Sequence, residues 1–171
     1  FDAIKGKDKM DSTSVEFPKI GNWKLEIKNL KIVVPKEYFI EGLDPEVEKI
    51  IKNAIKKYEE MGAKTEEVSL PHTEYAIPTN YIITPCEISA NVARYDGIKF
   101  GYSAAGPRIT LLDVYLKSRE EGFGEEVRRR IMLGTYALSA GYYEAYYLRA
   151  QKVRTLIRKD FEKALEEVDA I

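Results

Sequence analysis

"DPEVEKIIKNAIKKYEEMGAKTEEV", residues 44–68, decides the fold class of this 171-residue chain. Asp44 is a typical helix N-cap, Pro45 suits the first helical position, and Gly62 is a typical C-terminal stop. Between these signals an apolar face repeats at spacings of three and four residues, formed by Val47, Ile50, Ile51, Ala54, Ile55, Tyr58 and Met61. The pattern predicts an amphipathic helix over about residues 45–61.

Two short stretches that flank this helix are predicted to be strands. The first is "LKIVVP", residues 30–35, which is rich in β-branched residues and ends at a proline. The second follows the helix at residues 65–69. A strand, a helix and a strand in this order are typical of a right-handed crossover between parallel strands. We therefore predict an α/β fold in which the two strands are parallel and the helix packs across them.

The second half of the chain is predicted to be mostly helical. We expect a helix of about three turns over residues 85–97, beginning at Pro85, and a loop over residues 101–108 because of its glycines and proline. A second helix is predicted over residues 110–124, stopping near Gly122. Further helical patterns cover residues 126–154 and 146–168. We find no repeat or linker, so residues 1–171 are predicted to form a single segment of one domain.

The composition excludes several classes of protein. Basic and acidic residues nearly balance at 27 and 28, so the net charge of −1 argues against a surface devoted to nucleic acid. Cys86 is the only cysteine, which excludes an internal disulfide and favours a reducing compartment such as the cytoplasm. We see no membrane-spanning run, no metal-ligand spacing and no glycine-rich phosphate loop, and therefore expect no metal or cofactor in this chain.

The residues that could carry chemistry have simpler structural interpretations. Ser12 and Ser14 in "DSTS" are interpreted as parts of a turn or cap, since no base lies at a meaningful spacing. His72, the only histidine, could act as an acid or base, but a structural loop position is favoured because no partner is evident. Cys86 is interpreted as a small buried residue. The residues alone therefore favour a binding or scaffolding part over a complete enzyme.

Arginine and tyrosine are concentrated in "EVRRRIMLGTYALSAGYYEAYYLRAQKVR", residues 126–154. Arg128, Arg129 and Arg130 are consecutive, so on a helix they point about 100° apart and at most one or two can line a pocket. A guanidinium is suited to gripping a carboxylate through two parallel hydrogen bonds. A solvated basic turn is the simpler interpretation, and the residues alone favour it. The tyrosines are interpreted as packing residues with solvated hydroxyls.

Several stretches, taken in order, resemble one family. They are "GKDKMDSTS" at 6–14, "VPKEYFIEGLDPEV" at 34–47, "SLPHTEYAIPTNYII" at 69–83, "NVARYDGIKFG" at 91–101, residues 122–154, and "DFEKALEEVDAI" at 160–171. Together they are similar to the amidase signature family, and within it to the glutaminase subunits of tRNA-dependent amidotransferases. The resemblance covers nearly the whole chain and implies a mixed β-sheet covered by helices.

The resemblance also implies a function and a set of partners. The complete subunit would release ammonia from glutamine, and a B subunit with ATP and magnesium would use it to convert Glu-tRNA(Gln) to Gln-tRNA(Gln). A C subunit would stabilise this cytoplasmic heterotrimer, and the tRNA would be bound by the complex rather than by this segment. The alternatives are another amidase signature enzyme that acts on a small amide, and a non-catalytic interaction module.

The family pattern implies site residues as well. Its catalytic serines and lysine lie upstream of the "DSTS" motif, so we expect no catalytic residue here, an internal segment without both flanks, and no activity from the segment alone. In the family, a tyrosine and an arginine hold part of the glutamine. These match Tyr81 and Arg129, and Arg130 is the alternative match for the arginine. Asn80 stands where a tyrosine doublet is common, so the match to Tyr81 depends on the alignment at that position.

Overall fold

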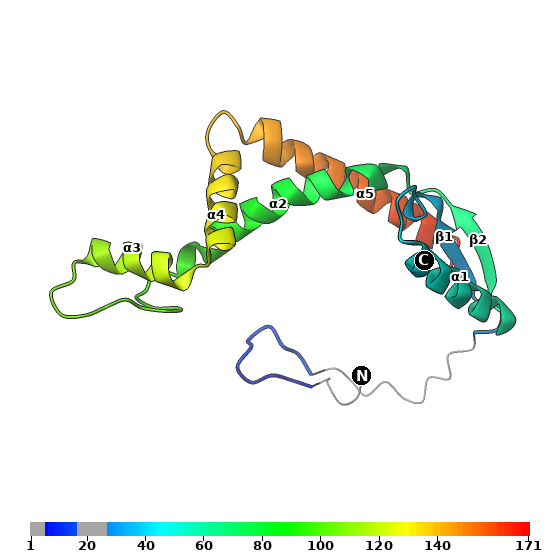
Figure 1. Cartoon of the computed structure of the whole chain (residues 1–171), viewed down its shortest axis with the longest axis horizontal. Helices are drawn as coiled ribbons and strands as arrows, with labels where there is room; N and C mark the ends of the chain where they lie inside the picture. Colours follow the sequence, from blue (N-terminus) through cyan, green and yellow to red (C-terminus); the bar gives the residue numbers. More distant parts are fainter. Residues whose placement is uncertain (1–5, 17–26) are drawn as a thin grey trace.

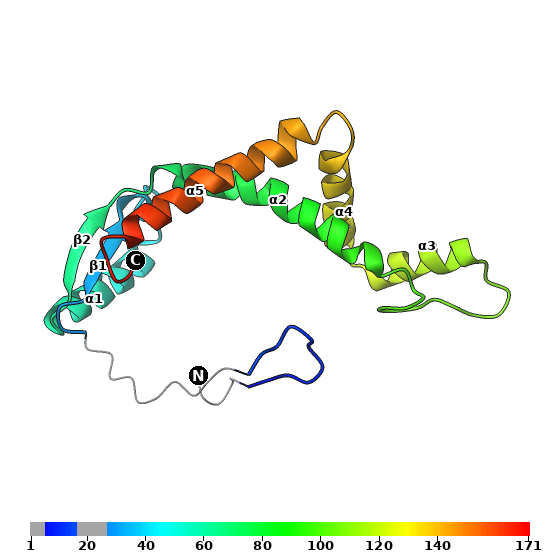
Figure 2. The same ribbon diagram turned by 180° about the vertical axis from the view of Figure 1, so that it is seen from behind.

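The computed structural model of the protein describes residues 6–16 and 27–171. Figure 1 shows an elongated arrangement with a small sheet and helix α1 at one end and helix α3 at the other. Helices α2 and α5 pack against each other between these ends, and α4 crosses α2 (Figures 1 and 2). Within the described part of the chain, no helix combines the length and the apolar character needed to cross a membrane.

The predicted strand–helix–strand unit is confirmed. Strands β1 (Lys31–Pro35) and β2 (Lys64–Val68) are parallel, in a register that places Lys31 opposite Lys64. Helix α1 (Pro45–Glu60) connects them, and each boundary lies within one residue of its prediction. The Asp44 side chain accepts hydrogen bonds from the backbone N–H groups of Glu46 and Val47, as expected of an N-cap. Local signals were therefore sufficient to predict this unit.

The end of the chain returns to the same sheet. Ala170 forms a parallel bridge with Ile32 of β1, and the backbone N–H of Val33 donates to the Ala170 carbonyl at 3.0 Å. The Asp169 side chain accepts from the backbone N–H of Lys31 at 2.9 Å. The α/β class is confirmed, while every strand pairing among the described residues is parallel, so the antiparallel part of the predicted mixed sheet is not found in them.

Helix α2 (Ala76–Asn91) corrects the prediction for residues 85–97. The helix begins nine residues before Pro85, which lies inside it, and ends before a short 3-10 turn at Val92–Arg94. Pro78 lies in the first turn, where a backbone N–H has no partner within the helix. Pro85 does remove one helical hydrogen bond, but it is buried against α4, and this tertiary contact overrides the usual stop signal.

The other helices of the second half follow the predictions with one exception. Residues 101–108 form a loop as predicted, and helix α3 (Leu111–Gly122) ends where expected. The prediction of one continuous helix over residues 126–154 is wrong. Helix α4 (Glu125–Leu138) ends at Ser139 in extended backbone, and Gly141 adopts a positive φ of 85°, which glycine tolerates best. A π-helical turn (Glu144–Leu148) then leads into α5 (Arg149–Leu165).

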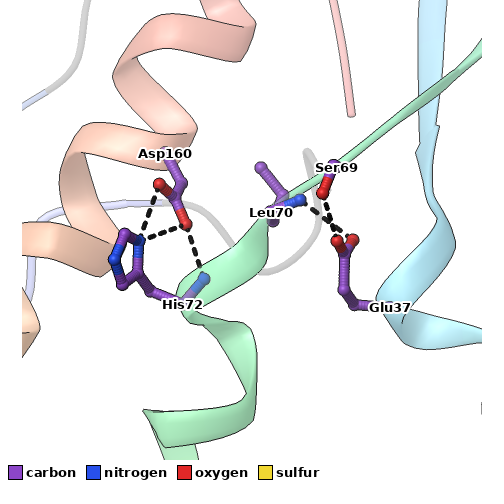
Figure 3. A network of polar contacts seen from close by, with 5 residues as sticks. All are labelled: Glu37, Ser69, Leu70, His72 and Asp160. Atoms are coloured by element: carbon purple, nitrogen blue, oxygen red, sulfur yellow. Dashed lines mark hydrogen bonds and ion pairs between the residues drawn. The ribbon is translucent and has the colours of Figure 1, made fainter.

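A network of polar contacts connects the sheet to helix α5 (Figure 3). Asp160 of α5 accepts from the backbone N–H of His72 at 2.9 Å, and its carboxylate lies 3.0 Å from Nδ1 of the same residue. Glu37 accepts from the backbone N–H of Leu70 and from the Ser69 hydroxyl, and these bonds lower the pKa of Glu37 in that order. Leu70 is completely buried between the two contacts. The network therefore fixes the corner from which α2 departs.

Replacing Asp160 with alanine is expected to destabilise this corner by about 1–3 kcal/mol, because the backbone N–H of His72 loses its acceptor in a partly buried place. Asp160→Asn keeps one acceptor oxygen, so its stability should lie between that of the unmodified protein and that of Asp160→Ala. Urea unfolding of the intact protein measures the effect. Glu162→Ala on the same helix is the control, since its exposed ion pair with Arg158 is expected to contribute little. Equal losses at both positions would contradict the assigned role of Asp160.

Candidate functional site

Helices α2 and α4 meet at a close contact between Pro85 and Gly134. Both residues are buried, and a Cβ atom added to Gly134 would lie 1.9 Å from the Pro85 carbonyl oxygen. Tyr81 lies one turn before Pro85, and Arg130 lies one turn before Gly134. The crossing therefore brings together two sequence segments that are about fifty residues apart.

The three predicted substrate-binding residues, Tyr81, Arg129 and Arg130, lie around one small hollow at this crossing. Its volume is about 30 Å³, and it is lined by Asn80, Tyr81, Thr84, Pro85, Arg129, Arg130 and Leu133. Pro85 has no N–H to donate to the Tyr81 carbonyl, so the helix itself cannot satisfy that acceptor in the usual way. The residues around the hollow thus include one tyrosine and two arginines.

Both arginines are bound to a carboxylate of their own helix. Arg129 donates from Nε to Glu126 Oε2 and from Nη2 to Glu126 Oε1, each at 2.7 Å, which is a bidentate pair. Arg130 donates from Nε to Oε1 of the same carboxylate at 2.8 Å. On a helix, residues three and four positions after Glu126 share its face, whereas Arg128 at two positions does not. This spacing selects Arg129 and Arg130 from the run of three.

The charges of this cluster follow from the contacts. Hydrogen bonds from Arg129 first and Arg130 second lower the pKa of Glu126 from 4.5 to about 2, so its carboxylate is ionised at neutral pH. The hydrogen bond with Glu126, and then the negative charge of that carboxylate, raise the pKa of Arg129. Two guanidinium charges and one carboxylate charge leave one net positive charge beside Tyr81. Such a cluster suits a ligand with a single carboxylate.

The structure supports parts of both interpretations of the arginine run. The Arg129 side chain is 58% exposed and paired within its own helix, as a solvated basic turn would be. Arg129 and Arg130 nevertheless line the hollow beside α2, as the ligand interpretation requires. Glu126 was not predicted as a site residue, although its spacing to the arginines was visible in the sequence. Glu126 also lies in the first turn of α4, where a negative charge interacts favourably with the helix dipole.

The remaining candidates have structural roles in the described residues. His72 does have a partner, Asp160, so the expectation that it lacks one is wrong. The contact joins two elements of the fold, which agrees with the predicted structural role of His72. Cys86 is buried as predicted, and burial raises the pKa of its thiol. Ser14 accepts from the backbone N–H of Asp8, and Asp11 accepts from that of Thr13, which confirms the predicted turn. Within residues 6–16 and 27–171, no group of three or more potential ligands could hold a metal ion.

The tyrosines at the end of α4 and in the segment that follows it pack on one another, as predicted. The ring centroids of Tyr136 and Tyr142 are 4.4 Å apart, and those of Tyr142 and Tyr146 are 6.1 Å apart. A hydrogen bond with Tyr142 raises the pKa of Tyr136 to about 12. All three side chains keep substantial exposure to solvent. Their contacts bridge the break between α4 and α5, which is a structural role.

Comparison with known proteins identifies the family. The chain belongs to the amidase family, whose pattern it matches over residues 1–171. It is 58% identical to the A subunit of the glutamyl-tRNA(Gln) amidotransferase of Geotalea daltonii, in an alignment that covers 99% of this chain and 36% of the relative. It is also 58% identical to the protein of the same name from Thermodesulfovibrio yellowstonii, covering 98% of this chain and 35% of the relative.

A solved structure supports the same relationship. The crystal structure of the glutamyl-tRNA(Gln) amidotransferase A subunit from Thermotoga maritima matches with a TM-score of 0.59 and 34% sequence identity. The match covers 96% of this chain and 31% of that one. The chain therefore spans about a third of the length of the relatives that it matches.

Proposed function

We propose that this chain is part of the glutaminase subunit of a tRNA-dependent amidotransferase, which releases ammonia from glutamine for the conversion of Glu-tRNA(Gln) to Gln-tRNA(Gln). The names of the relatives support this proposal. The observation that carries it is the pair of arginines beside Tyr81 at the α2–α4 crossing. This arrangement suits the α-carboxylate and polar groups of a small amino acid.

In this proposal, the chain binds and orients glutamine. Arg129 holds the α-carboxylate through two parallel N–H groups, which is the geometry that a guanidinium favours. The Tyr81 hydroxyl can donate or accept one hydrogen bond and so orients a second polar group of the substrate. Arg130 adds positive charge on the same side of the hollow. Fixing the substrate at several points prepares its amide for attack.

The attacking group in this proposal lies outside the chain. Amide hydrolysis requires an activated nucleophile, and we assign that role to the serines and lysine of the amidase signature region. The released ammonia would pass to a B subunit, where ATP and magnesium activate the glutamate of Glu-tRNA(Gln). A C subunit would complete the cytoplasmic heterotrimer, and the tRNA would contact the complex rather than this segment.

The test compares the intact protein, together with its partner subunits, and the 171-residue chain alone. Ammonia release is measured with glutamine, asparagine and other small primary amides. We expect the intact protein to hydrolyse glutamine and the isolated chain to give no turnover above buffer, because positioning groups alone give little rate. Turnover by the purified chain that survives Tyr81→Phe and Arg129→Ala would contradict both the location of the nucleophile and the site. Preference of the intact protein for another small amide would favour a different amidase.

A further inference from the structure

The carboxylate of Glu126 binds the two arginines in different ways. It occupies the Nε and Nη2 side of Arg129 with two hydrogen bonds but only the Nε of Arg130. A guanidinium carries five N–H donors, so the terminal edge formed by Nη1 and Nη2 still has donors on both arginines. A ligand carboxylate can therefore bind end-on while Glu126 stays bound side-on.

We propose that Glu126 is a positioning residue that holds Arg129 and Arg130 in the orientation in which their terminal edges receive the substrate carboxylate. This inference rests on the proposed function, since it concerns how the same site grips an amino acid. It assigns to Glu126 a role in substrate affinity rather than in bond cleavage.

The physical reason is preorganisation. Arginine side chains lose considerable rotamer freedom when they bind a ligand, and both arginines are substantially exposed, so neighbouring packing restrains them only in part. Two adjacent guanidinium groups also repel each other. A shared carboxylate reduces this repulsion and orders both side chains before the ligand arrives, which lowers the cost of binding.

If Glu126 had a different role, its removal would change the KM for glutamine in the opposite direction. A carboxylate that competed with the substrate for the same guanidinium edge would weaken binding, and its removal would lower KM. The observed side-on contact leaves the terminal edges open, which favours positioning over competition. The direction of the change in KM therefore separates the two roles.

The experiment measures kcat and KM for ammonia release from glutamine by the intact protein and its Glu126→Ala variant. A second substrate is the glutamine analogue in which the α-carboxylate is replaced by a carboxamide. We expect Glu126→Ala to raise the KM for glutamine about three- to tenfold with kcat changed less than about twofold, and to affect the analogue much less. Glu126→Gln keeps one acceptor oxygen and should recover part of the affinity. Glu125→Ala is the matched control, since this neighbour in the same helical turn makes no ion pair among the described residues.

The outcomes separate this inference from the proposed function. If the unmodified protein does not hydrolyse glutamine, the proposed function fails. If it does, an unchanged or lower KM in Glu126→Ala overturns the positioning role. An equal loss with glutamine and with the analogue also overturns it, because the effect would then be independent of the substrate carboxylate. If Glu126→Ala proves unstable, Glu126→Gln is measured in the same way, and the same KM criterion decides.

Discussion

Glutamine-dependent kcat/KM of the intact protein is expected to fall roughly tenfold to a few hundredfold when Arg129 is replaced by lysine. Lysine keeps the positive charge but loses the planar fork that grips a carboxylate by two hydrogen bonds. It also loses the bidentate contact with Glu126, so the remaining cation is less well placed. A titration of glutamine in the ammonia-release assay measures the effect.

A second titration with free ammonia distinguishes binding from stability. Ammonia does not need the glutamine site, so amidation of Glu-tRNA(Gln) supported by ammonia should remain near the rate of the unmodified complex. Arg128→Ala is the control, because Arg128 lies outside the face shared by Glu126 and its partners. Equal losses with both nitrogen donors would show that Arg129 has a structural role, and the solvated-turn interpretation of the arginine run would then be correct.

Replacement of Gly134 by alanine is expected to destabilise the intact protein by about 1–3 kcal/mol or more. The new Cβ would lie 1.9 Å from the Pro85 carbonyl oxygen and 2.8 Å from the Cys86 backbone nitrogen. Backbone atoms within a helix cannot move aside as a flexible side chain can, so α4 must shift away from α2. In an exposed helix the same substitution would stabilise the protein by about 1 kcal/mol through helix propensity. A loss of stability instead of a gain therefore identifies the close contact.

Chemical denaturation measures this change, and Gly124→Ala provides the control. Gly124 precedes the same helix, has no positive φ, and has no atom within 4 Å of the position of an added Cβ. Its replacement loses only a favoured N-cap residue, so it should cost no more than about 0.5–1 kcal/mol, less than the replacement of Gly134. Because the crossing also places Tyr81 beside Arg129, Gly134→Ala should raise the KM for glutamine. A neutral or stabilising effect would contradict the contact between the two helices.

The local features of the fold could be predicted from the sequence. Asp44 and Gly62 delimit α1, and the spacing of apolar residues between them identifies a helix because both signals depend on neighbours within one or two turns. The pairing of Glu126 with Arg129 and Arg130 is equally local, and its spacing could have been used in the same way. Family resemblance added the choice of Tyr81, Arg129 and Arg130, which residue chemistry alone did not favour.

Other features depended on contacts between distant segments. Pro85 signals a helix start, yet it lies inside α2, because its burial against α4 outweighs the lost hydrogen bond. The break at Ser139 and Gly141 interrupts a pattern that is typical of one continuous helix. Asp160 and His72 are 88 residues apart, so nothing local to His72 reveals its partner.

The sequence by itself determined the β-α-β unit, the helical second half and the chemistry available to the site. Only the tertiary structure decided that Tyr81 and Arg129 share one hollow. That proximity depends on how closely α2 and α4 approach, and the approach depends on a glycine that leaves room for a backbone carbonyl of the facing helix. Periodicity and capping act over one or two turns of chain, whereas this contact joins segments separated by several elements and exists only when both helices are packed.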